Sequence, residues 1–106
     1  MRIHYTERGC EASDKLRGII EKKLAKLNKF IDEDTDAYVT LTRESKRHIM
    51  EITIPFNGMM LRSEEECEDF YSAIDDIVNA LERQIRKQRT RLERRVRENA
   101  FADYVP

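Results

Sequence analysis

The segment from Arg83 to Arg97 contains eight lysine and arginine residues and a single acidic residue, Glu93. The rest of the chain has the opposite balance. Residues 1–82 carry 12 basic and 18 acidic side chains, a net charge of −6, whereas residues 83–106 carry 8 against 3, a net charge of +5. Ammonium and guanidinium groups at this density attract polyphosphates. The segment is therefore predicted to bind nucleic acid, and RNA in particular.

A second basic face belongs to a helix predicted earlier in the chain. At ~100° per residue, its lysines fall on one stripe, with one further lysine at the boundary: Lys15, Lys22, Lys26 and Lys29, then Lys23. On the later helix, five basic residues lie opposite the apolar stripe and three lie closer to it: Arg83, Arg86, Lys87, Arg94 and Arg97, then Arg89, Arg91 and Arg95. If the helices are neighbours, the two faces can merge. The alternative is two solvated faces with i,i+4 ion pairs, but the later helix has too few acids to balance its charge.

The sequence contains no candidate catalytic residues. The sequence contains no paired acid and base, no nucleophile motif and no Gly-rich phosphate loop. His4 and His48 have no Ser, Cys or carboxylate partner at a recognisable spacing. Cys10 and Cys67 stand far apart, with no His at ligand spacing, so no disulfide framework or zinc site is indicated. We therefore expect a protein that is not an enzyme, with no cofactor, no metal and no small-molecule substrate.

The first half of the chain predicts a strand, a helix and two more strands. Polar and apolar residues alternate over residues 2–7, 37–43 and 48–54, which is typical of half-buried strands. Ser13 is a suitable N-cap, and the apolar spacing from Leu16 to Ile31 predicts a helix of about five turns. Pro55 is expected to end the third strand. Asn57 and Gly58 then predict a hairpin turn, because both residues accept positive φ.

A fourth strand is expected from Met59 to about Glu64, where Met59 and Met60 should pack. A long helix then follows from about Cys67 to near Asn99. Its start is contested: a capping-box spacing begins at Ser63, but strand pairing needs the same residues. We favour a start between residues 66 and 69. Its apolar stripe comprises Phe70, Ile74, Ile77, Leu81, Ile85, Leu92 and Val96, and Tyr71 is expected to join Phe70 and Ile74 in the core.

The element order predicts an α+β fold, β-α-β-β-β-α, with a four-stranded sheet and both helices packed on one face. We expect one domain over residues 1–99, followed by a C-terminal tail or the start of a linker over residues 100–106. No apolar run is long enough to span a bilayer, and the N-terminus does not resemble a signal peptide. The protein is therefore expected to be cytoplasmic and to have no membrane partner.

The chain resembles the ribosome hibernation-promoting factor family, also called protein Y or ribosome-associated inhibitor A, specifically its N-terminal ribosome-binding domain. Three segments carry the resemblance: 21–30 (EKKLAKLNKF), 68–75 (EDFYSAID) and 81–87 (LERQIRK). It covers about residues 1–95 in collinear order. The family's β-α-β-β-β-α fold, which is similar to double-stranded-RNA-binding domains, agrees with the order predicted from periodicity.

The resemblance implies a function and a site. Family members bind the small ribosomal subunit in the channel that holds mRNA and the A-site and P-site tRNAs, and they silence translation under stress or in stationary phase. Their rRNA-binding residues match Lys23, Lys26, Lys29, Arg83, Arg86, Lys87 and Arg91 here, and the stripes described above add Lys22 and Arg94. Ribosome pairing, or a homodimer, is expected only if a further C-terminal domain exists in the full-length protein.

Two alternatives of other classes stay open. A general binder of structured or double-stranded RNA would have comparable affinity for free duplexes. A dimerising scaffold would use the long helix as a coiled coil, but Gln88 interrupts the sustained heptad that this requires. Sedimentation with ribosomes and with duplex RNA across a salt series separates these hypotheses.

Overall fold

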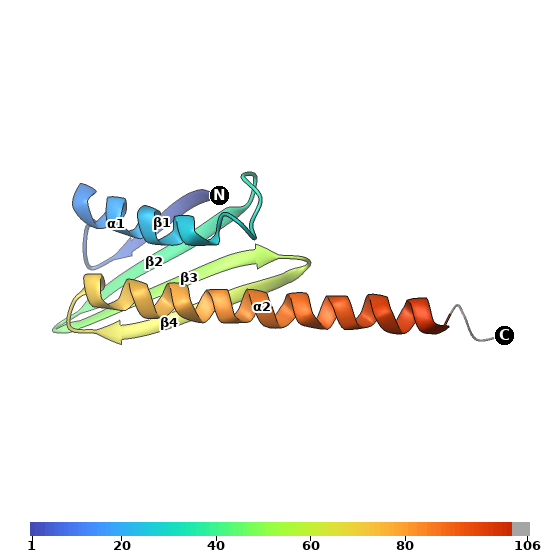
Figure 1. The fold of residues 1–106 in the computed structure, drawn as a ribbon. Coiled ribbons are helices and arrows are strands. Elements are labelled where there is room, and N and C mark those ends of the chain that lie inside the picture. The colour runs from blue at the N-terminus through green and yellow to red at the C-terminus, as the bar shows by residue number, and fades with distance from the viewer. Residues whose placement is uncertain (103–106) are drawn as a thin grey trace.

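A computed structural model describes the backbone of residues 1–102 and the side chains of residues 1–91. Both helices lie on the same side of a four-stranded sheet (Figure 1), which confirms the predicted α+β fold and element order. The elements are β1 (Arg2–Arg8), α1 (Asp14–Leu24), the short 3-10 helix η1 (Ala25–Leu27), β2 (Asp36–Glu44), β3 (Arg47–Phe56), β4 (Met59–Cys67) and α2 (Phe70–Ala102).

The sheet has the strand order β1-β2-β3-β4. β1 pairs with β2 in parallel, so the chain crosses over through α1, whereas β2, β3 and β4 form an antiparallel meander. Asn57 and Gly58 join β3 to β4 with φ values of 49° and 77°. These positive values are those that the predicted hairpin turn requires. The meander is thus set by short local connections, and β1 is added at its edge.

Pro55 does not end β3, and that expectation is wrong. The strand continues to Phe56, and Pro55 is paired with Met60 of β4. The ladder between β2 and β3 stops at the Tyr38–Thr53 pair, so β3 has only β4 as a neighbour beyond that point. Proline is tolerated where a strand becomes an edge, because its missing N–H leaves no ladder hydrogen bond broken.

Helix α1 begins as expected and ends early. The Ser13 hydroxyl accepts a hydrogen bond from the Leu16 N–H at 3.1 Å, which is N-cap geometry. The α-helix stops at Leu24, not near Ile31, and tightens into η1. Leu27 and Ile31 are nevertheless buried. The apolar spacing of three and four residues thus continues through a 3-10 turn. Periodicity alone does not distinguish such a turn from an α-helix.

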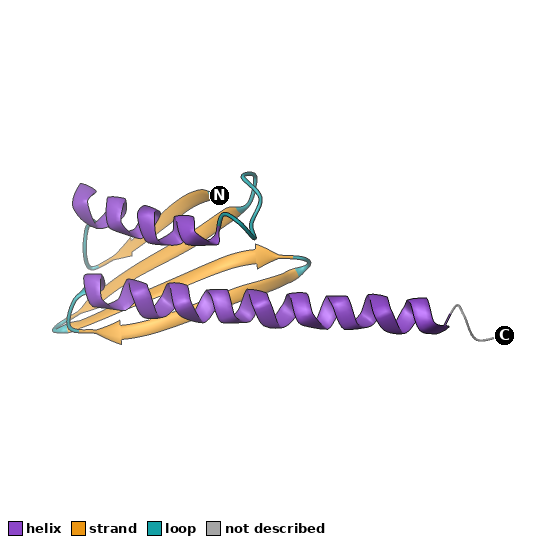
Figure 2. Ribbon diagram, in the orientation of Figure 1, coloured by secondary structure: helices purple, strands orange, loops and turns teal. Residues whose placement is uncertain are grey.

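Helix α2 has the later of the two predicted starts. It begins at Phe70, where the Asp69 carboxylate accepts a hydrogen bond from the Ser72 N–H at 2.9 Å. Its 33 residues span nearly 50 Å at ~1.5 Å per residue. The first half packs over β3 and β4, and the second half projects past the sheet (Figure 2). The side chains of Leu92 and Val96, and part of the tail predicted from residue 100, lie outside the described residues.

A single apolar cluster between sheet and helices forms the core, and every buried residue among those described is apolar. Two expectations are corrected here. Tyr71 is 43% exposed, because the buried stripe of α2 runs through its neighbours Phe70 and Ile74. Met59 and Met60 are 53% and 59% exposed, at the start of β4 directly after the hairpin turn.

Candidate nucleic-acid interface

Helices α1 and α2 lie side by side, and ion pairs join them across their contact (Figure 1). The Lys23 ammonium lies 3.0 Å from the Asp75 carboxylate. One turn beyond the end of α1, the Lys29 ammonium lies 3.7 Å from the Glu82 carboxylate. Both acids belong to the flank of α2 that faces α1. The basic residues of the first helical segment are thus held beside those of the second.

The two basic faces meet at a half-buried aromatic ring, Phe30, which packs against the core. The Lys29 ammonium lies 5.1 Å from the ring centroid, and the guanidinium carbons of Arg86 and Arg89 lie at 5.6 and 5.5 Å. Each distance is within the range of a cation–π interaction. Glu82 completes the group, and we call these five residues the Phe30 cluster: Lys29, Phe30, Glu82, Arg86 and Arg89.

Glu82 bridges two cations of this cluster. Its Oε1 accepts a hydrogen bond from Arg86 at 3.1 Å and lies 3.7 Å from the Lys29 ammonium. The Arg86 hydrogen bond, with the nearby positive charges of Arg86 and Lys29, lowers the pKa of the Glu82 carboxyl below its ordinary value. Glu82 is therefore ionised at neutral pH, and its carboxylate is shared by Arg86 of α2 and by Lys29 from the turn after η1.

The structure places the nine predicted site residues in three groups. Lys23, Lys29 and Arg86 form the ion pairs described above. Five others are exposed and form no ion pair within residues 1–91: Lys22, Lys26, Arg83, Lys87 and Arg91. The side chain of Arg94 lies outside the described residues. The predicted merging of the two faces is thus seen at the Phe30 cluster, whereas an rRNA-binding role for any residue stays a prediction.

Four residues of this surface were not in the predicted set: Phe30, Asp75, Glu82 and Arg89. Arg89 was placed closer to the apolar stripe of α2, and in the structure this position brings it to the Phe30 ring. The sequence does contain a signal for Phe30, since an aromatic residue directly follows Lys29 at the edge of the apolar stripe. Which aromatic faces a second basic helix depends on how α1 and α2 are docked.

The open face of the sheet has the opposite character, because three of its arginines, Arg2, Arg47 and Arg62, are paired with acids. Arg62 lies 2.9 Å from Glu51 and 3.6 Å from Glu64. Arg47 lies 2.7 Å from Glu66, and this hydrogen bond lowers the pKa of the Glu66 carboxyl. Arg2 and His4 both reach Asp36 at 2.9 Å. Paired charges of this kind give little attraction for phosphate, so the helix face is the better candidate.

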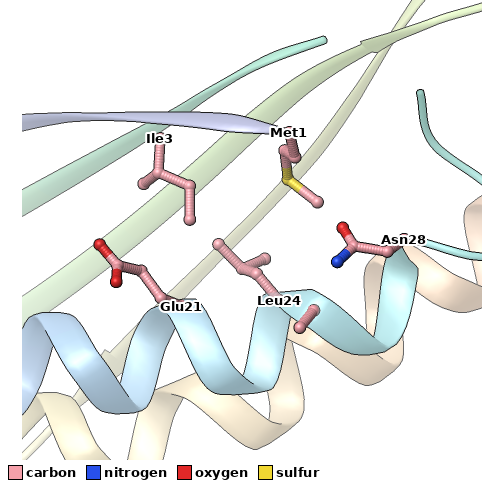
Figure 3. Close-up of a pocket in the computed structure, with 6 residues that line it drawn as sticks. Met1, Ile3, Glu21, Leu24 and Asn28 are labelled. Carbon is pink, nitrogen blue, oxygen red and sulfur yellow. The ribbon is translucent and has the colours of Figure 1, made fainter. Parts of the chain in front are cut away.

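A pocket of about 270 Å³ lies on the other side of α1, against β1. Figure 3 shows Met1 and Ile3 facing Glu21 and Asn28 across it, with Leu24 at its floor. Its one ionisable side chain is the acid Glu21, so the pocket is unsuited to phosphate. Within the described residues, no group of three His, Cys, Asp or Glu side chains is placed to hold a metal ion. Among residues 1–102, no helix is both long and apolar enough to cross a membrane.

Comparison with known proteins shows similarity along nearly the whole chain. The chain is 38% identical over 108 residues to the ribosome hibernation promotion factor of Bacillus subtilis, covering 97% of this chain and 57% of that protein. It is 40% identical over 100 residues to the protein of the same name from Lactococcus lactis, covering 90% and 54%. The chain thus spans about half the length of the curated relatives it matches.

Two solved structures share the fold. The N-terminal domain of Thermus thermophilus protein Y superposes with a TM-score of 0.73 at 38% identity, covering 82% of this chain and 98% of that domain. A ribosomal subunit interface protein from Coxiella burnetii superposes with a TM-score of 0.77 at 26% identity, covering 85% and 99%. Residues 3–93 match the family described as Sigma 54 modulation protein / S30EA ribosomal protein. This match confirms the resemblance noted in the sequence, and the chain belongs to that family.

Proposed function

We propose that this domain is a ribosome hibernation factor that binds the small ribosomal subunit in the channel of mRNA and of the A-site and P-site tRNAs. It would act in the cytoplasm and silence translation under stress or in stationary phase. One observation carries the proposal: cations from α2 and from the turn after η1 converge on one exposed surface, at the Phe30 cluster. Support also comes from relatives whose names state ribosome hibernation and from a structural neighbour named for the ribosomal subunit interface.

The proposed mechanism is occupancy. Lysines supply point charges near phosphate, and arginines supply forked donors that also stack on bases. These groups surround no catalytic constellation among the described residues. By occupying the channel, the bound domain would itself exclude mRNA and tRNA. Inhibition would then need no nucleotide, metal or turnover. The proposed rRNA-binding residues are those of the helix face, namely Lys22, Lys23, Lys26, Lys29, Arg83, Arg86, Lys87, Arg91 and Arg94.

Cosedimentation with purified small subunits tests the binding step. With about 6–10 phosphate contacts, affinity should fall by roughly 10³–10⁵ between 50 and 200 mM salt. Bound protein should be displaced by mRNA together with initiator tRNA. Equal affinity for a free RNA duplex would favour the general structured-RNA binder. Absence of binding to small subunits at low salt would refute the proposal.

A purified translation assay tests the mechanism. Inhibition should follow the fraction of ribosomes occupied, so that half inhibition requires about half an equivalent of protein at concentrations well above Kd. Initiation components added in excess should relieve it. Complete inhibition by a small fraction of an equivalent would indicate turnover, and a gel showing cleaved rRNA would identify a nuclease instead.

A further inference from the structure

Three positive groups share one aromatic ring in the Phe30 cluster. Lys29 comes from the chain after η1, whereas Arg86 and Arg89 come from α2, yet all three cationic centres lie 5.1–5.6 Å from the Phe30 centroid. The ring itself is anchored, because Phe30 packs against the core. The side chains of Lys29 and Arg86 are still 61% and 63% exposed. The cations are thus gathered around one anchored ring while remaining accessible to a ligand.

We propose that Phe30 is a positioning residue that preassembles Lys29, Arg86 and Arg89 into one binding site for an RNA backbone phosphate. The inference rests on the proposed function and deepens it, since it names the ligand chemistry and the residue that organises the site. Phe30 itself need not touch the phosphate. It acts through the three cations, whose heads it holds on the outer surface between the two helical segments.

The physical argument starts from like-charge repulsion. Three cations held around one ring repel one another, and long side chains lose rotamer freedom when they are held there. The negative face of the ring offsets part of this repulsion. Glu82 offsets a further part, because its carboxylate contacts both Lys29 and Arg86. An incoming phosphate can replace this carboxylate as the shared anion and then meets cations that are already in place.

The experiment compares binding of Phe30 variants to two probes: purified small subunits and a short uridine homopolymer. Phe30→Leu keeps an apolar side chain against the core and removes the ring. We expect it to weaken binding to both probes by about tenfold at low salt. The dependence of log K on log salt should keep its slope, because all three cations remain. Arg86→Gln should instead lower the slope by about one.

Rescue and coupling distinguish positioning from a purely structural role. Phe30→Tyr retains a ring face and should bind as the native protein does. Arg89→Gln should weaken binding much less in the Phe30→Leu background than in the native background, because the ring no longer holds Arg89. Tyr71→Leu is a matched control: Tyr71 is also an aromatic beneath a cation, Lys15 at 5.8 Å, but it lies outside the cluster. The affinity of Tyr71→Leu for both probes should equal that of the native protein.

The outcomes separate this inference from the proposed function. Native affinity in Phe30→Leu, or additive effects of Phe30→Leu and Arg89→Gln, would overturn the inference even if small subunits bind tightly. Loss of small-subunit binding by the native protein would refute the proposed function, while the homopolymer would still test the site. If Phe30→Leu fails to fold, Phe30→Met replaces it, because methionine fills more of the volume of the phenylalanine side chain. The same results would then support or overturn the inference.

Discussion

The side-chain amide of Gln84 forms two hydrogen bonds with the backbone of Arg62. Its Oε1 accepts from the Arg62 N–H at 3.1 Å, and its Nε2 donates to the Arg62 carbonyl at 2.8 Å. Arg62 belongs to β4, an edge strand whose outward backbone groups have no neighbouring strand. A helix side chain therefore takes the place of a fifth strand at this position, which protects the edge from pairing with another chain.

Replacing Gln84 by Met should destabilise the domain, because it leaves these two backbone groups without their partner. We expect a loss of about 1–2 kcal/mol in the free energy of unfolding, measured by urea denaturation. Gln88→Met is the control, since the Gln88 side chain forms no hydrogen bond to residues 1–91. Equal stability of the two variants would show that the Gln84 bonds contribute nothing net.

The two basic helical segments should matter equally for ribosome binding. Lys26→Glu with Lys29→Glu should weaken small-subunit binding at low salt by at least about a hundredfold, and Arg86→Glu with Lys87→Glu should do the same. The physical reason is that Lys29 and Arg86 belong to one cluster. Circular dichroism should show an intact fold, because all four side chains are exposed.

A matched control for these pairs carries the same change of charge elsewhere. Arg43→Glu with Lys46→Glu alters two exposed residues near the turn between β2 and β3, at the opposite end of the sheet from the projecting half of α2 (Figure 1). Its binding should fall far less. If the Lys26 and Lys29 pair behaved like this control, the surface would belong to α2 alone.

Glu82→Gln should strengthen binding to small subunits severalfold at low salt. The substitution removes the carboxylate that competes with phosphate for Lys29 and Arg86, while Phe30 continues to hold both cations. Filter binding across a salt series measures the effect, which should shrink as salt screens the site. Weaker binding by Glu82→Gln would mean that the carboxylate, and not the ring, organises the cluster.

The loss of folding stability at low pH should depend in part on the Asp36 carboxylate. Hydrogen bonds from His4, and then from Arg2, lower the pKa of the Asp36 carboxyl below its ordinary value of 3.8. A carboxyl with a lowered folded-state pKa contributes stability that is fully present above its unfolded value and is lost as pH falls through the folded value. Between about pH 5 and pH 2, Asp36→Asn should therefore lose less stability than the native protein in urea denaturation. Parallel losses would contradict this assignment.

Much of the fold follows from local rules in the sequence. Ser13, Asn57 and Gly58 each require a particular backbone geometry, and the structure has that geometry at all three. The competition at residues 63–69 was also settled in favour of strand pairing, since β4 runs to Cys67 and α2 starts at Phe70. Caps and turns are predictable because the residues that determine them lie within a few positions of one another.

Features that depend on neighbours in space were predicted less well. The ends of α1 and β3 were misplaced because Leu27 is buried equally well by a 3-10 turn and because Pro55 lies beyond the last β2 partner. At the candidate site, the sequence indicated which residues are basic and on which face. It did not indicate that Asp75 and Glu82 would pair with lysines of the first segment, since that depends on the docking of two helices.

The crossover from β1 to β2 has a consequence for the order of folding. The strands of the meander are joined by tight turns, whereas β1 meets β2 only after the chain has closed a loop through α1, with Arg2 opposite Asp36. Loop closure makes such distant pairings slower to form. We therefore expect the β2–β4 meander with α2 to form first and the β1–α1 unit to dock last. The Phe30 cluster contains residues of both units. An RNA bound at this cluster would therefore stabilise the docked state of the β1–α1 unit.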